Sequence, residues 1–274
     1  MATGLKTERK PKAHPLGLDA GQVLYLYGVS QRPKDAVPEV AAEGIDGAAA
    51  MEAVAYQGYL CWVSRVSRAE FADRLREQME NLEWLASAGL RHQRAVSAIA
   101  ERFTILPARF GTVFLSEGSL AQHLRDHKKN MPRVFERLAG ADEWGIKVFE
   151  TAKPEIMAAS EVPASGREYL KRKAESLQPK RGVGHGDEMR GLIRELSSLS
   201  EDSSPGGKAS LGQPGLLWHG SFLVKRKDRK KLQTVLEKYA AKWQDKWRID
   251  CSGPWPTYSF VAPSPGRGRR SHGQ

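Results

Sequence analysis

The stretch Gly58–Leu75, GYLCWVSRVSRAEFADRL, changes from a run of β-forming side chains to a basic turn and then to an amphipathic helix. Gly220–Leu236, GSFLVKRKDRKKLQTVL, repeats this order. Each stretch is followed further along the chain by a proline-containing aromatic segment, LPARFGTVF after the first and GPWPTYSFV after the second. Because the same pattern occurs twice, the sequence predicts two related units that each combine strands and helices.

The first half of the chain supplies the other elements of one such unit. A buried strand is expected at Gln22–Val29, QVLYLYGV, because β-forming apolar residues fill the run. Ser67 and Glu70 have the spacing of a capping box, which predicts that a helix begins at Ser67. Gly89 is expected to bend or end the helical region, and Ala108–Leu115 is expected to be a strand. The apolar stripe expected on the helix consists of Phe71, Leu75, Met79 and Leu82.

The second half repeats strands and helices around a segment of low apolar content. That segment, residues 201–215, EDSSPGGKASLGQPG, is rich in Gly, Pro and Ser and predicts a flexible loop. The expected strands are Trp144–Phe149, Leu216–Val224 and Trp247–Cys251, and the expected helices are Arg167–Leu177, Glu188–Leu199 and Asp228–Trp243.

These elements predict an α+β protein made of two α/β sandwiches, each an antiparallel sheet with helices on one face. The second sandwich is expected to be ferredoxin-like. The polar, proline-containing ends of the chain indicate a disordered arm and a disordered tail. The predicted boundaries are a disordered arm at 1–20, an N-terminal α/β domain at 21–140, a C-terminal ferredoxin-like domain at 141–262 and a basic tail at 263–274.

The composition narrows the class of protein. The chain has 274 residues and two cysteines, Cys61 and Cys251, too few for a disulfide framework or a four-cysteine zinc site. Its longest apolar runs are far shorter than the roughly 20 residues that span a bilayer. No N-terminal segment has the pattern of a secretory signal. We therefore expect a soluble protein of a reducing compartment, with no membrane partner.

Positive charge is concentrated in the second half of the chain. The net charge is +11, and residues 161–274 hold 22 basic and 12 acidic side chains. The densest run is Lys225–Lys231, KRKDRKK, which fits a contact with nucleic acid or an acidic protein but is also typical of a solvated helix start. A basic nucleic-acid-binding protein is therefore the alternative function. No known nucleic-acid-binding signature is present, and no aromatic residues interleave with the run.

The sequence contains no complete set of catalytic or metal-binding residues. Gly182–Gly186, GVGHG, lacks the spacing of a phosphate-binding loop. His123 and His127 are four residues apart and share a helix face, but no third ligand is recognisable, so a solvated helix face is favoured. His92 lies among apolar helix positions and is expected to be packed or to cap a helix. We therefore predict neither an enzyme nor a bound cofactor or metal.

The candidates for partner binding are aromatic residues and their neighbours in two motifs. Two prolines flank Trp255 and hold it in an extended backbone, so that it either fills the core of its own domain or anchors a partner. The other motif, Arg109-Phe110-Gly111, is open to the same two interpretations, because Gly111 permits either a close backbone approach or a bulge. The candidate partner-site residues are Arg109, Phe110, Gly111, Trp255, Tyr258 and Phe260.

Several segments resemble those of one family, in the same order along the chain. They cover roughly residues 22–262, and ARFGTVF, EWGIKV and GPWPTYSFV are specific in combination. The matching segments are Tyr25–Gly28, Leu82–Leu85, His92, Leu106–Phe114, Glu143–Val148 and Gly253–Val261. The family that they resemble is that of the gas vesicle accessory proteins GvpL and GvpF. The arm, the tail and the insert at 178–186 are additions to the common core and gain no function from this resemblance.

The resemblance implies a non-enzymatic accessory protein of the gas vesicle, located in the cytoplasm and associated with the vesicle. It would assist assembly of the shell by binding the main shell protein, remain as a minor vesicle component, or do both. The implied partners are the main shell protein and other gas vesicle accessory proteins, and no specific nucleic acid is expected. A shell subunit with an apolar face and free β-edges would aggregate before assembly, and a soluble partner that offers a sheet edge or a groove could hold it.

Overall fold

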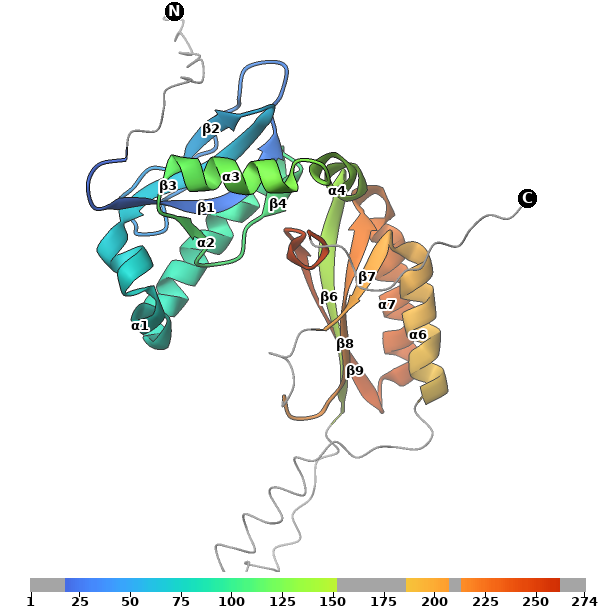
Figure 1. Ribbon diagram of the computed structural model, residues 1–274. Coiled ribbons are helices and arrows are strands. Elements are labelled where there is room, and N and C mark those ends of the chain that lie inside the picture. The colour runs from blue at the N-terminus through green and yellow to red at the C-terminus, as the bar shows by residue number, and fades with distance from the viewer. Residues whose placement is uncertain (1–17, 152–185, 207–212, 262–274) are drawn as a thin grey trace, which may run out of the picture. The chain divides into compact units, whose positions relative to one another are not determined.

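The computed structural model describes residues 18–151, 186–206 and 213–261 (Figure 1). The described chain folds into two compact units. Unit 1 contains the residues up to Gly140 together with Pro256–Val261, and unit 2 contains Ala141–Trp255. Both this division and the expected one separate Gly140 from Ala141, whereas residues 256–261, expected in the second domain, group with unit 1. The predicted helix at 167–177, the tail at 263–274 and most of the arm lie outside the described residues.

Unit 1 is built on a five-stranded antiparallel sheet. Its strand order is β2-β3-β1-β4, with β5 also paired to β1. The strands are β1 (Gln22–Gln31), β2 (Glu52–Tyr56), β3 (Tyr59–Ser67), β4 (Ile105–Pro107) and β5 (Val113–Phe114). The helices are η1 (Ala69–Asp73), α1 (Leu75–Glu80), α2 (Leu82–Arg102), α3 (Glu117–His127), α4 (Met131–Leu138) and η4 (Tyr258–Phe260).

Helices cover both faces of the unit 1 sheet. Tyr25 and Tyr27 of β1 pack in a core cluster with α2, whereas Leu24 and Leu26 pack in a second cluster with α3 and α4. β1 is therefore buried on both faces, which explains its unbroken run of apolar residues. The expectation of helices on one face is wrong for unit 1, which has three layers (Figure 1).

The predicted helix beginning at Ser67 is broken into shorter pieces. The first piece, η1, is a single π-helical turn without a side-chain cap, so the predicted capping box does not form. The side chain of Asn81 instead caps α2 by accepting two backbone N–H groups of its first turn. The predicted stripe is divided accordingly, because Phe71 is buried while Met79 and Leu82 are 43% and 80% exposed.

Two further expectations in unit 1 are wrong. Gly89 neither bends nor ends α2, which continues to Arg102. A glycine inside a helix costs about 1 kcal/mol relative to alanine, and burial of Ala88 and His92 on either side of it outweighs this cost. Of the predicted strand Ala108–Leu115, Val113–Phe114 forms the short strand β5, and a turn at residues 109–112 separates it from β4, which ends at Pro107.

Unit 2 has the element order strand, helix, strand, strand, helix, strand among its described residues. The sheet order is β7-β8-β6-β9, antiparallel throughout, and α6 and α7 pack in one core cluster with the sheet (Figure 1). This arrangement fits the expected ferredoxin-like βαββαβ unit. The elements are β6 (Ala141–Glu150), α6 (Gly186–Leu199), β7 (Asp202–Pro205), β8 (Leu216–Lys225), η3 (Arg226–Asp228), α7 (Arg229–Trp243) and β9 (Trp247–Trp255).

Two strands of unit 2 differ from the prediction. The flexible loop expected at 201–215 contains β7, which forms because Asp202–Pro205 pairs with β8. The last strand extends beyond Cys251 to Trp255, because β9 continues to pair with β6 after a register shift. Both differences arise from pairing with a neighbouring strand, which contributes more to strand formation than local propensity.

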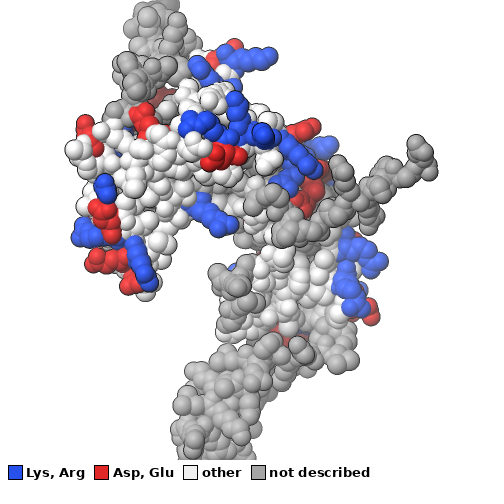
Figure 2. All heavy atoms as spheres, viewed as in Figure 1, with Lys and Arg blue, Asp and Glu red and all other residues white. Residues whose placement is uncertain are grey.

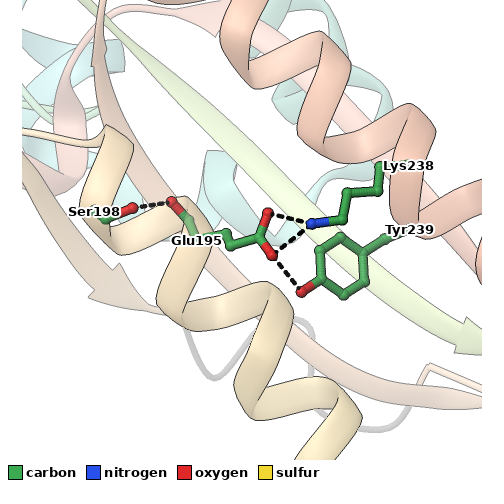
Figure 3. A network of polar contacts seen from close by, with 4 residues as sticks. All are labelled: Glu195, Ser198, Lys238 and Tyr239. Atoms are coloured by element: carbon green, nitrogen blue, oxygen red, sulfur yellow. Dashed lines mark hydrogen bonds and ion pairs between the residues drawn. The ribbon is translucent and has the colours of Figure 1, made fainter.

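A polar network joins α6 to α7 (Figure 3). Lys238 Nζ donates to both carboxylate oxygens of Glu195, at 2.8 and 3.0 Å, and the Tyr239 hydroxyl donates to the same group at 2.9 Å. These two hydrogen-bonding partners hold the pKa of Glu195 below its usual value. A second ion pair, Lys246 with Glu188 at 2.8 Å, connects the first turn of α6 to the residues that follow α7. The two helices are therefore held in register over the apolar core of unit 2.

Candidate functional site

His92 is the centre of a buried aromatic cluster in unit 1. Its ring lies edge-on to Tyr25 and to Phe110, with 5.7 Å between ring centroids in both cases. It stacks on Tyr27 at 6.0 Å and lies 6.2 Å from Tyr258. These residues come from β1, α2, the turn between β4 and β5, and η4. This set, the His92 cluster, therefore joins four segments that are distant along the chain.

The local sequence explains why these side chains meet. Successive side chains of a strand point to opposite faces, so Tyr25 and Tyr27 both point toward α2. On α2, Ala88, His92 and Ala95 recur at four- and three-residue spacing and belong to the buried face. His92 is thus the polar member of an apolar stripe, and the small alanines on either side leave room for the tyrosine rings.

Both ring nitrogens of His92 have hydrogen-bond partners. Nδ1 lies 2.8 Å from the hydroxyl oxygen of Tyr25, and Nε2 lies 3.1 Å from that of Tyr258. The backbone N–H of Gly111 donates to the Tyr25 oxygen at 3.2 Å. A neutral imidazole has one donor and one acceptor nitrogen, so one tyrosine donates to the ring and the other accepts from it.

Burial keeps His92 uncharged at neutral pH. The residue is 4% exposed. Burial lowers the pKa of its ring from 6.5 to about 4, against a smaller upward effect of the Ala108 backbone. Burial also raises the pKa of the Tyr25 hydroxyl. A base that is enclosed in this way is out of reach of a substrate in solution, so the His92 cluster is a structural junction.

The turn from Arg109 to Thr112 has one side in this cluster and one side in solvent. The backbone N–H and the hydroxyl of Thr112 both donate to the Arg109 carbonyl, at 3.1 and 2.7 Å. Gly111 has φ +79°, a left-handed conformation that glycine adopts without a Cβ penalty. Phe110 packs against the core of unit 1, and Arg109 is exposed. Three predicted site residues therefore lie together, and the Arg109 side chain faces solvent.

The segment Pro256–Val261 returns the chain to unit 1 and supplies two more of the predicted residues. Tyr258 is half-buried against the His92 cluster, and Phe260 is fully buried. Arg137 of α4 donates a hydrogen bond to the Phe260 carbonyl. The structure thus brings Tyr258 together with Phe110 and Gly111, and places Phe260 in the interior of the same unit.

Trp255 belongs to unit 2 rather than to the His92 cluster. It is the last residue of β9, opposite Glu143 of β6. Its side chain is 43% exposed and is not part of the described core cluster of unit 2. Of the two interpretations of the sequence, a core residue or an anchor for a partner, this exposure favours the anchor.

The basic run Lys225–Lys231 lies at the junction of β8 and α7. Arg226 forms an ion pair with Asp142 at 3.0 Å. The Arg229 guanidinium lies over the Trp144 ring, 5.2 Å from its centroid. Part of this charge is therefore used in contacts inside unit 2, as expected of a basic helix start.

Two observations within the described part of the chain concern clusters of metal-binding side chains and the reactivity of thiols. Within residues 18–151, 186–206 and 213–261, no group of three or more His, Cys, Asp or Glu side chains is placed to hold a metal ion. Burial raises the pKa of the Cys61 thiol to about 12, so this cysteine is not a thiolate nucleophile at neutral pH. In the same ranges, every helix is too short or too polar to cross a bilayer.

The sequence alone does not identify His92 as the residue that the candidates Phe110 and Tyr258 both contact. Two local signals point to it, namely the pair Tyr25 and Tyr27 on one face of a strand and a histidine inside an apolar helical stripe. No local signal links it to Tyr258, because 166 residues separate the two.

Comparison with known proteins gives consistent matches to one family. Residues 23–262 match the model of a family described as gas vesicle synthesis protein GvpL/GvpF. Gas vesicle protein L of Streptomyces sp. (strain CB03234) is 30% identical over 258 residues, which cover 89% of this chain and 94% of the relative. Gas vesicle protein L of Haloferax mediterranei is 28% identical over 202 residues, which cover 63% of this chain and 60% of the relative.

Solved structures share the fold. The crystal structure of gas vesicle protein GvpF from Anabaena sp. PCC7120 has a TM-score of 0.63 at 20% identity and covers 90% of this chain and 99% of that chain. GvpF from Microcystis aeruginosa has a TM-score of 0.61 at 18% identity, covering 88% and 99%. The family match includes nearly all described residues of both units. The chain therefore belongs to the gas vesicle synthesis protein GvpL/GvpF family.

Proposed function

We propose that this protein assists assembly of the gas vesicle shell by binding the main shell protein, acts as a minor vesicle component, or does both. The observation that carries the proposal is the family match, which spans both units and whose description is that of a gas vesicle synthesis protein. The role is that of a cytoplasmic, vesicle-associated accessory protein without catalysis, and other gas vesicle accessory proteins are further partners.

The sheet edges support binding of a subunit that itself contains strands. Within the described residues, β2 is at an edge of the unit 1 sheet, and β7 and β9 are at the edges of the unit 2 sheet. β9 is the longest of these, with nine residues. A free edge can accept a further strand through main-chain hydrogen bonds. An edge strand of this protein could therefore pair with a strand of an unassembled shell subunit and hold that subunit.

Exposed apolar side chains support contact with an apolar partner. Leu82 is 80% exposed, Leu90 51% and Met79 43%, and all three lie on α1, α2 or their junction. The first two are on the same helix, eight residues apart, which places them roughly 80° apart around its axis and about 12 Å apart along it. Exposed apolar groups in one helical region favour association with an apolar surface of a partner.

The proposal is tested by co-expressing this chain with the main shell protein and measuring co-purification and solubility of the shell protein. We expect the shell protein to remain soluble and to co-purify. Leu90→Glu is expected to weaken the association, whereas Leu115→Glu, at a leucine of similar exposure (58%) outside α1 and α2, serves as the matched control. Absence of co-purification, together with normal vesicles in a deletion strain, would refute the proposal.

A further inference from the structure

The last turn of α3 brings two histidine side chains together. The ring centroids of His123 and His127 are 4.4 Å apart. Residues four positions apart lie on the same face of an α-helix, and both of these are exposed. The pair is therefore open to a small ion from solution.

A hydrogen bond to the backbone fixes the tautomer of one of the two rings. His127 Nδ1 lies 2.8 Å from the backbone carbonyl oxygen of His123. A carbonyl oxygen only accepts, so the proton is on Nδ1 and Nε2 of the neutral ring retains its lone pair. Metal-bound histidines commonly donate their other ring N–H to a carbonyl or carboxylate in this way, which fixes the tautomer and the ring orientation.

His123 also has an aromatic neighbour, because its ring lies 5.3 Å from the ring of Phe114. Both histidines are also at the C-terminal end of α3, where the helix dipole stabilises a cation.

The charged side chains around the pair are of both signs. Arg125 donates to the Tyr56 hydroxyl at 2.8 Å, and Lys128 donates to the Gln57 side chain at 3.1 Å. Acidic and basic side chains are intermingled on the face of unit 1 that α3 covers (Figure 2). A divalent cation at the histidine pair would therefore have both negative and positive side chains nearby.

We propose that His123 and His127 together bind one divalent transition-metal ion of the Zn²⁺, Ni²⁺ or Cu²⁺ class, with water completing its coordination. Imidazole suits these ions, and hard cations such as Mg²⁺ or Ca²⁺ prefer oxygen ligands. The described residues supply two protein ligands, so the ion exchanges readily with solution. Its binding joins positions four apart and thereby stabilises the last turn of α3.

The test is calorimetric titration of the untagged full-length protein with ZnCl₂ and NiCl₂ at neutral pH. The key variant, Gln122→His/His123→Gln, keeps the number of histidines but places the pair five residues apart, about 140° around the helix axis. We expect single-site binding in the wild type and in the control His219→Gln. We expect binding at least about tenfold weaker in His127→Gln and in the exchanged pair, because one imidazole then holds the ion alone.

Two results would overturn the proposal, namely equal affinity in the exchanged pair or no saturable binding in the wild type. Circular dichroism without metal checks that each variant folds. If the exchanged pair fails this check, His127→Gln supplies the comparison. The melting temperature is a second readout, since added Zn²⁺ should raise it in the wild type and in His219→Gln and leave it unchanged in the variants that lack the pair.

Discussion

The hydroxyl oxygen of Tyr258 lies 3.1 Å from Nε2 of His92, although 166 residues separate the two. This contact joins the segment Pro256–Val261 to α2 of unit 1. Unit 2 is therefore inserted in the sequence of unit 1, and the core of unit 1 is completed only after the chain has passed through β9. A truncation before Pro256 is consequently expected to remove part of a core rather than a free end.

Replacement of Tyr258 by phenylalanine is expected to destabilise unit 1 by about 1–3 kcal/mol, because a buried ring nitrogen of His92 loses its hydrogen-bond partner. The aromatic packing is kept in this variant. Urea unfolding measures the change in the free energy of unfolding. Tyr59→Phe is the control, since this ring stacks on Phe135 at 5.8 Å and its hydroxyl forms no hydrogen bond within the described residues. Equal losses in the two variants would contradict the role assigned to Tyr258.

The buried state of His92 predicts a loss of stability in acid. The unfolded chain protonates this ring below pH 6.5, whereas the folded chain does so only near pH 4. Between these values the unfolded state binds more protons, so the free energy of unfolding falls as the pH falls. The contribution of His92 to this loss is expected to reach about 3 kcal/mol.

Unfolding measured at several pH values from 6.5 to 4 checks this prediction. His92→Gln removes the titrating group, so it should be less stable than the wild type at neutral pH but lose less stability on acidification. The same pH dependence in both proteins would show that other groups control the acid sensitivity.

The conformation of Gly111 predicts a backbone effect. At φ +79° an alanine costs about 1–2 kcal/mol. A Cβ at this position would lie 3.6 Å from the Leu75 side chain, an ordinary contact, so no steric clash adds to this cost. Gly118→Ala, inside α3, is the matched control and is expected to be neutral or stabilising by up to about 1 kcal/mol. Thermal unfolding compares the two, and a stabilised Gly111→Ala would refute the prediction.

Much of the fold could be predicted because its elements have strong local patterns. The apolar run at Gln22–Val29 forms all of β1 except its last two residues, and the Asp228–Trp243 pattern forms α7 with one residue of difference at its start. What the pattern could not indicate is which partner covers each face. β1 is buried on both sides by helices from different parts of the chain, and a continuous apolar run is compatible with either one or two covered faces.

The His92 cluster was beyond local prediction for the same reason. Its members come from segments distant along the chain, and Tyr258 joins them only because the chain returns to unit 1 after unit 2, which depends on contacts rather than on spacing. Arg137, which holds the Phe260 carbonyl, has no sequence signal that distinguishes it from other surface arginines. The sequence therefore indicates individual candidate residues, but their contacts with His92 are known only from the tertiary structure.

Two tryptophans at opposite ends of β9 separate the two interpretations of Trp255. Trp247 is 2% exposed in the core of unit 2, so Trp247→Ala is expected to destabilise this unit by about 3–5 kcal/mol. Trp255 is 43% exposed, so Trp255→Ala should lose clearly less. Because Trp255 is a rigid, exposed aromatic side chain, its loss should instead weaken co-purification with the main shell protein. A loss of stability equal to that of Trp247→Ala would assign Trp255 to the core. Unchanged co-purification of a folded variant would remove it from the partner site.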